Sequence, residues 1–171
     1  MDKRTLILGA LFTAACGAPG DLSPDAVQNI PDGDATGSTL TGTYDIELRV
    51  TECSGSCGPF SVGIFSASVC DVGDTDSGRI EVVQRDGHLT IDTDDLPSRF
   101  EGAAFGDGSF EVGGYATQFG GDLQITARSL GQVHADGTLE STIRSRSWGE
   151  VEGNDADCVG VREVTGVRDD D

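Results

Sequence analysis

Apolar and polar residues alternate along most of the chain. In Tyr44–Val50 an apolar side chain occupies every second position, and Asp45, Glu47 and Arg49 lie between them. A period of two is typical of a strand with one buried face, and no segment keeps a convincing helical period. The same alternation recurs in seven further segments: Arg79–Gln84, Leu89–Asp92, Phe100–Phe105, Phe110–Tyr115, Leu123–Ala127, Leu139–Trp148 and Val159–Val167. The pattern predicts an all-β domain.

Short turn sequences separate these segments. Asp86-Gly87, Asp107-Gly108 and Asp136-Gly137 each lie between alternating runs, and Gly120-Gly121 makes a fourth break. Such residues tolerate the backbone conformations of tight hairpins. Successive hairpins form an antiparallel meander, and eight strands let the last strand lie antiparallel to the first. We therefore expect an up-and-down barrel, which leaves no exposed sheet edge.

One apolar stretch does not fit the strand count. Residues 58–69 are apolar enough for a ninth strand, but their alternation is poor. Cysteines lie on both sides, at Cys53, Cys57 and Cys70. The sequence favours a cysteine-tethered flap over one mouth of the barrel, with a ninth strand as the alternative.

The N-terminus has the layout of an export signal. Lys3 and Arg4 precede an apolar run that ends on the small residues Ala14 and Ala15, and the run is too short to span a bilayer. The alternative, a core helix of a cytoplasmic protein, does not explain why the run has no polar face. We therefore expect residues 1–15 to be a removed signal peptide.

The residues Thr13-Ala14-Ala15-Cys16 resemble the lipobox of bacterial lipoproteins. The resemblance implies that Cys16 is acylated and becomes the mature N-terminus, so that the domain is anchored to the cell envelope. Gly17, unlike an aspartate at that position, does not imply retention at an inner membrane, which favours the outer membrane. Buried acyl chains add about 0.8 kcal/mol of membrane affinity per methylene group.

The segment from Cys16 to Thr39 is rich in proline and aspartate and almost free of aromatic residues. Such a composition cannot bury enough apolar surface to offset its ordering entropy. It predicts a flexible tether over residues 16–39 that carries a barrel domain over residues 40–171.

The chain is strongly acidic, with a formal net charge of −19. Removal of residues 1–15 takes away Lys3 and Arg4 together with Asp2, a net +1, and so gives −20 and no lysine. Binding to nucleic acid or to an anionic lipid surface needs a basic footprint, so neither is expected. Self-repulsion of the acidic surface favours a monomer.

Four cysteines remain besides Cys16: Cys53, Cys57, Cys70 and Cys158. In an exported chain this even number favours two disulfides over a four-cysteine zinc site. Six predicted strands separate Cys70 from Cys158, which places both at the same end of the barrel. That placement favours a Cys70–Cys158 bridge with Cys53–Cys57 as the second, although the other two pairings remain possible.

The region from Leu40 to Arg168 resembles a lipocalin-like (calycin-type) barrel in its strand count, its hairpin turns and its opening Gly42-Thr43-Tyr44. The resemblance implies an apolar ligand inside the barrel.

The sequence offers little for catalysis, and we expect a protein that is not an enzyme. His88 and His134 flank turns and are expected at the surface, and no nucleophile, metalloprotease or phosphate-binding motif is present. Aspartates cluster in Asp71–Asp76 and Asp32–Asp34 without the spacing of an EF-hand. We expect neither a cofactor nor a metal ion.

A ligand cavity is the stronger functional candidate, because an eight-stranded barrel is just wide enough to hold one small ligand or to be filled by side chains. Small residues on the expected inner face leave room, as at Gly102, Gly114 and Ser147. The expected lining residues are Phe100, Ala104, Val112, Ala116, Ile143 and Ser145. The alternative is a barrel filled by its own side chains that acts as a structural or protein-interaction module.

Overall fold

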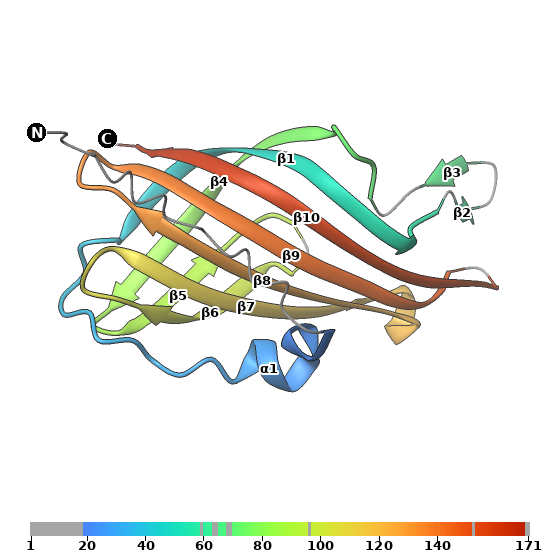
Figure 1. The fold of residues 1–171 in the computed structure, drawn as a ribbon, viewed down its shortest axis with the longest axis horizontal. Helices are drawn as coiled ribbons and strands as arrows, with labels where there is room; N and C mark the ends of the chain where they lie inside the picture. The colour runs from blue at the N-terminus through green and yellow to red at the C-terminus, as the bar shows by residue number, and fades with distance from the viewer. Residues whose placement is uncertain are drawn as a thin grey trace, which may run out of the picture.

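The computed structural model describes residues 19–58, 60–62, 65–67, 70–95, 97–151 and 153–169. Eight antiparallel strands form a closed barrel in the order β1-β10-β9-β8-β7-β6-β5-β4 (Figure 1). Their bounds are β1 Gly42–Ser56, β4 Thr75–Arg85, β5 His88–Asp92, β6 Arg99–Ala104, β7 Ser109–Gln118, β8 Leu123–Val133, β9 Thr138–Val151 and β10 Asn154–Arg168. The predicted all-β meander is confirmed, and the barrel is consistent with a calycin-like fold.

The predicted signal peptide, residues 1–15, and the predicted acylation site Cys16 lie outside the described residues. Within the described part of the chain, no helix is long and apolar enough to cross a membrane.

The predicted turns occur between the expected strands. Asp136 Oδ1 accepts hydrogen bonds from the backbone nitrogen of Thr138 at 3.0 Å and from its Oγ1 at 2.7 Å. Gly137 takes a φ of +84°, which glycine adopts without steric cost. The side chain of Asp107 makes the same two contacts with Ser109. These two hairpins are therefore fixed by residues that are local in sequence.

One end of the barrel, where β1 begins and β10 ends, is closed by side chains and by the segment before β1. The hydroxyl of the fully buried Tyr44 donates to the carbonyl oxygen of Leu40 at 2.9 Å and accepts from Arg168 Nη2 at 2.6 Å. The buried Gln84 Oε1 accepts from the backbone nitrogen of Leu40 at 2.8 Å. These contacts hold Leu40 in the core and make this end a sealed floor.

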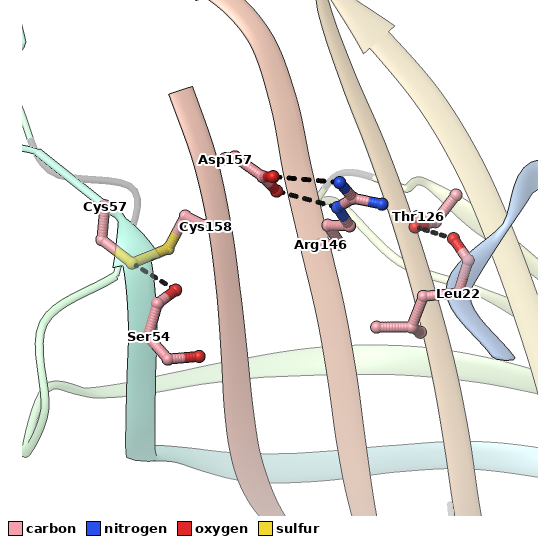
Figure 2. Close-up of polar contacts among 7 residues, drawn as sticks. All are labelled: Leu22, Ser54, Cys57, Thr126, Arg146, Asp157 and Cys158. Atoms are coloured by element: carbon pink, nitrogen blue, oxygen red, sulfur yellow. Dashed lines mark hydrogen bonds and ion pairs between the residues drawn. A yellow bond between two sulfur atoms is a disulfide. The ribbon is translucent and has the colours of Figure 1, made fainter. Parts of the chain in front are cut away.

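The segment before the barrel differs from the flexible tether that its composition predicts. A 3-10 turn, η1 (Pro19–Leu22), and a short helix, α1 (Pro24–Gln28), lie against the outer face of β7 and β8 (Figure 1). Leu22 and Val27 are buried there, and Thr126 Oγ1 donates to the carbonyl oxygen of Leu22 at 2.8 Å (Figure 2). The expectation of a free tether is therefore wrong for residues 21–39.

Residues 21–39 are ordered because of features of the barrel wall, not because of their own composition. A Cβ at Gly113 would lie 2.1 Å from the carbonyl oxygen of Val27, so only glycine lets the helix approach β7 this closely. Further along, the backbone nitrogens of Gly33 and Ala35 donate to carbonyl oxygens of Gly87 and Ala104 at 2.8 and 3.1 Å. The segment gains its order from this preformed surface, which its own composition does not reveal.

The apolar stretch after β1 adds no strand to the barrel. Phe60–Val62 (β2) and Phe65–Ala67 (β3) pair with each other as a separate two-stranded sheet. The hairpin lies at the end of the barrel where β1 finishes (Figure 1). The ninth strand is thus excluded, and the stretch is a hairpin between Cys57 and Cys70.

All four predicted disulfide cysteines are bonded, but not in the favoured pairing. The bridges are Cys57–Cys158, which Figure 2 shows, and Cys53–Cys70, so the expected Cys70–Cys158 and Cys53–Cys57 pairs are wrong. Strand β1 continues through Ser56, well beyond the predicted end at Val50. Extended chain rises about 3.3 Å per residue, so Cys53 and Cys57 are held too far apart for a bridge.

A bulge in β1 changes which face of the strand its cysteine occupies. The pairing of β1 with β10 shifts register between Val50 and Glu52. The extra residue reverses the alternation, so that Cys53, like Cys57 beyond the strand, packs against the cluster of Val50, Cys70 and Cys158.

Candidate functional site

The interior of the barrel contains a cavity of about 640 Å³. It extends from the sealed floor to the opposite end, where exposed residues of the β5–β6 loop and of the segment before β4 border its mouth. The volume lies within the range typical of small-molecule sites, roughly 300–1,000 Å³. The barrel interior therefore has room for a small molecule.

The deeper wall of the cavity is apolar. Strand alternation turns one apolar residue after another inward from β1, β4, β5, β6 and β7. This apolar wall consists of Ile46, Ile80, Ile91, Phe100, Phe110 and Val112. It offers van der Waals contact and no hydrogen-bonding group, which suits a hydrocarbon body.

The wall formed by β8, β9 and β10, called here the polar wall, carries the polar side chains of the cavity between apolar ones such as Ile125, Leu139 and Ile143. Ser129 from β8 and Ser141, Ser145 and Ser147 from β9 line the cavity together with Arg162 from β10. Ser129 and Ser145 are themselves buried. The cavity is thus amphipathic, with hydroxyl groups and one positive charge on one side.

Arg162 is the one charged residue of this polar wall, and sequence reasoning missed it. Its Nη1 donates to Ser145 Oγ at 2.9 Å, and it lies opposite Val50 of β1 and Ile143 of β9. Burial inside the barrel lowers the pKa of the guanidinium, and the negative charge of Asp95 partly offsets this shift. An arginine stays protonated under all ordinary conditions, so the cavity holds a permanent positive charge.

The alternation of β10 hides Arg162 because valines occupy both faces of the strand. Val159 and Val161 point to the outer side, whereas the buried Val164 shares the inner side with Arg162. Cys158 is the sequence signal that could have placed Arg162. Because disulfide-bonded Cys158 and apolar Val164 are both expected to face inward, the even-numbered residues of β10, including Arg162, are assigned to the inner face.

Four of the six predicted lining residues border the cavity: Phe100, Val112, Ile143 and Ser145. Ala104 does not border the cavity; it lies in the same buried cluster as Phe100 and Val112, with its backbone bonded to Gly87 and Ala35. Ala116 is half-buried near the end of β7 and does not border the cavity.

The mouth of the cavity is acidic. Asp74 and Asp76 border it on one side, and Asp94 and Asp95 border it on the β5–β6 loop; all four are exposed. The loop closes on itself through a 2.9 Å hydrogen bond from the backbone nitrogen of Thr93 to the carbonyl oxygen of Ser98.

A disulfide borders the same end of the cavity. The Cys53–Cys70 bridge brings a sulfur to the inner face of β10, since a Cβ at Gly160 would lie 3.0 Å from Cys70 Sγ and 3.5 Å from Ser145 Oγ. The mouth is therefore braced covalently beside the polar wall.

Both histidines lie at the closed end, away from the mouth. His88 Nδ1 is 2.8 Å from Asp32 Oδ1 on the outer surface, and His134 Nε2 is 3.8 Å from Glu140 Oε2. Over the described ranges of the chain, no three histidine, cysteine or acidic residues come close enough together to hold a metal ion. The cavity itself presents Arg162, hydroxyl groups, the carboxylates of its mouth and apolar surface.

No family model matches this sequence, and no curated protein matches it. The inference of function accordingly rests on the cavity and its lining.

Proposed function

We propose that the protein is a membrane-anchored envelope lipoprotein, non-catalytic, whose barrel binds one small ligand with a substantial apolar part. The observation that carries the proposal is the 640 Å³ cavity with an apolar inner wall. A barrel used only as a structural or interaction module gains stability from a filled interior, because unfilled volume loses packing contacts. An open cavity behind a sealed floor is better explained by a ligand.

The envelope location is supported by the sequence alone, through the basic start, the apolar run and the lipobox-like residues before Cys16. Metabolic labelling with a palmitate analogue tests this part. The intact chain should incorporate label and sediment with membranes, and a Cys16→Ser chain should do neither. Equal labelling of both chains would contradict acylation at Cys16.

Binding in the cavity can be tested with an uncharged fluorescent dye, N-phenylnaphthylamine, which brightens in apolar surroundings. The test protein is residues 17–171, exported to an oxidising compartment so that both disulfides form. We expect saturable binding of one dye molecule per chain.

A pair of tryptophan variants on one strand locates the dye. Ile143→Trp places a large ring in the cavity and should abolish dye binding, whereas Thr142→Trp places the same ring on the exposed outer face of β9. The Thr142 variant should bind as the parent does. Equal loss in both variants, or no binding by the parent, would refute the cavity as the site.

A further inference from the structure

The guanidinium of Arg162 has hydrogen-bonding capacity that the fold does not use. A guanidinium carries five N–H donors, and Ser145 Oγ accepts the one hydrogen bond that the structure gives Arg162. Among the described residues, Arg128 Nε is the sole buried side-chain polar atom without a partner. The remaining nitrogens of Arg162 therefore border accessible space, and the accessible space around this residue is the cavity.

The charge of Arg162 is not neutralised by a close carboxylate. Within the described part of the chain Arg162 makes no ion pair, and Asp95 influences it only at longer range, from an exposed position on the mouth loop. Arg162 is half-buried, and a partly desolvated charge without a paired partner costs free energy in the folded state. A leucine at this position would fill the barrel better, so the arginine points to a role in the ligand-bound protein.

The position of Arg162 defines how a ligand would lie. On the inner face of β10, Val164 and Gly166 continue toward the sealed floor, and Gly160 and Cys158 continue toward the mouth. Arg162 thus lies between the apolar floor and the acidic rim. A ligand with its charged group at Arg162 would extend its apolar body along Ile80, Phe100 and Phe110.

Resting on the proposed function, we infer that the ligand carries a single carboxylate, which binds the guanidinium of Arg162 and the hydroxyl of Ser145. A planar guanidinium matches a carboxylate with two parallel hydrogen bonds. The acidic rim of Asp74, Asp76, Asp94 and Asp95 and the net charge of −19 disfavour a doubly charged group such as a phosphate monoester. The single positive charge of Arg162 neutralises the single negative charge of a carboxylate.

The test compares two probes that share an alkyl chain and differ in the head group, dodecanoic acid and dodecyl alcohol. Each is titrated against the bound N-phenylnaphthylamine at neutral pH, where the acid is ionised. The parent protein should bind the acid more tightly than the alcohol. Arg162→Gln should weaken binding of the acid roughly ten- to a hundredfold and change binding of the alcohol less than about threefold.

Two further variants separate charge from geometry and from unfolding. Arg162→Lys keeps the charge without the planar fork and should retain part of the preference for the acid. Arg85→Gln makes the same charge change on the exposed end of β4 and should bind both probes as the parent does. Urea unfolding of each variant confirms that it is folded during the titration.

The outcomes distinguish this inference from the proposed function. Equal affinity of the parent for acid and alcohol, or equal weakening of both by Arg162→Gln, would overturn the carboxylate while the cavity remains a binding site. Failure of the dye and of both probes to bind the parent would overturn the proposed function and this inference with it.

Discussion

The disulfide pairing makes a quantitative prediction about stability. Cys57 and Cys158 are separated by 101 positions, and Cys53 and Cys70 by 17. In the loop-entropy model, closing loops of these lengths stabilises the folded state by about 4.7 and about 3.1 kcal/mol. Replacing Cys57 and Cys158 by serine should therefore lower the free energy of unfolding more than replacing Cys53 and Cys70, by roughly 1.5 kcal/mol.

Urea unfolding followed by Trp148 fluorescence measures both losses. The variant without the Cys57–Cys158 bridge should unfold at a lower urea concentration and with a steeper dependence on urea, because its unfolded chain exposes more surface. Its melting temperature should fall by roughly 9 to 19 °C. The matched control is the Cys53→Ser/Cys70→Ser chain, which keeps the long loop closed.

Thiol labelling of that control decides the pairing itself. After denaturation without reductant, the Cys53→Ser/Cys70→Ser chain should show no free thiol, because Cys57 and Cys158 remain bonded. Two free thiols in this chain, or a larger loss of stability than in the Cys57→Ser/Cys158→Ser chain, would refute the account.

Three further outcomes follow from individual contacts. Val27→Ala should lower the free energy of unfolding by about 1 to 2 kcal/mol in urea titrations, because Val27 of α1 is fully buried against the barrel, whereas a free tether would show no change. Arg146 binds Asp157 at 2.8 and 3.0 Å (Figure 2) and lowers the pKa of that carboxyl, so the pair stabilises the fold above the ordinary aspartate pKa of 3.8 and loses this contribution as the pH falls through the lowered value. The stability difference between the parent and Asp157→Asn should be constant from neutral pH to about pH 5 and shrink at lower pH, and a difference undiminished at about pH 2 would contradict this sign. Arg162→Leu should raise the melting temperature of the ligand-free protein, because it removes a half-buried charge without a close partner; calorimetry showing a lower value would contradict the cost assigned to Arg162.

The barrel could be predicted because its signals are local. Alternation over five or six residues identifies a strand, and pairs such as Asp136-Gly137 and Asp107-Gly108 carry both the backbone freedom and the side-chain acceptor that a hairpin needs. A meander joins neighbours in sequence, so the strand order follows once the turns are known.

The predictions of the cysteine pairing and of the tether were wrong because both features depend on residues far apart in sequence. The bulge at Thr51 and the extension of β1 to Ser56 arise from pairing with β10 more than 100 residues later, and they redirect the cysteines. The docking of residues 21–39 depends on the glycine at position 113 of the barrel wall. Each needs the register of the closed barrel before it can be inferred.

The lining of the cavity was predicted only in part. Phe100, Val112, Ile143 and Ser145 were placed on the cavity wall by alternation alone. Arg162 was missed because a charged residue among valines on both faces gives no clear inner side. The residue that most narrows the choice of ligand was thus the one that the hydrophobic pattern treats as solvent-facing.

The central claim is that the cavity holds a ligand, and native mass spectrometry tests it most directly. Residues 17–171 are purified without detergent from an oxidising compartment, in the parent form and as Ile143→Trp. Both proteins are then incubated with a lipid extract of the cell envelope of the bacterium that expresses them. We expect an added mass of one small molecule per parent chain that disappears on denaturation and is absent from Ile143→Trp. A parent chain that carries no added mass, or an added mass that Ile143→Trp retains, would contradict it.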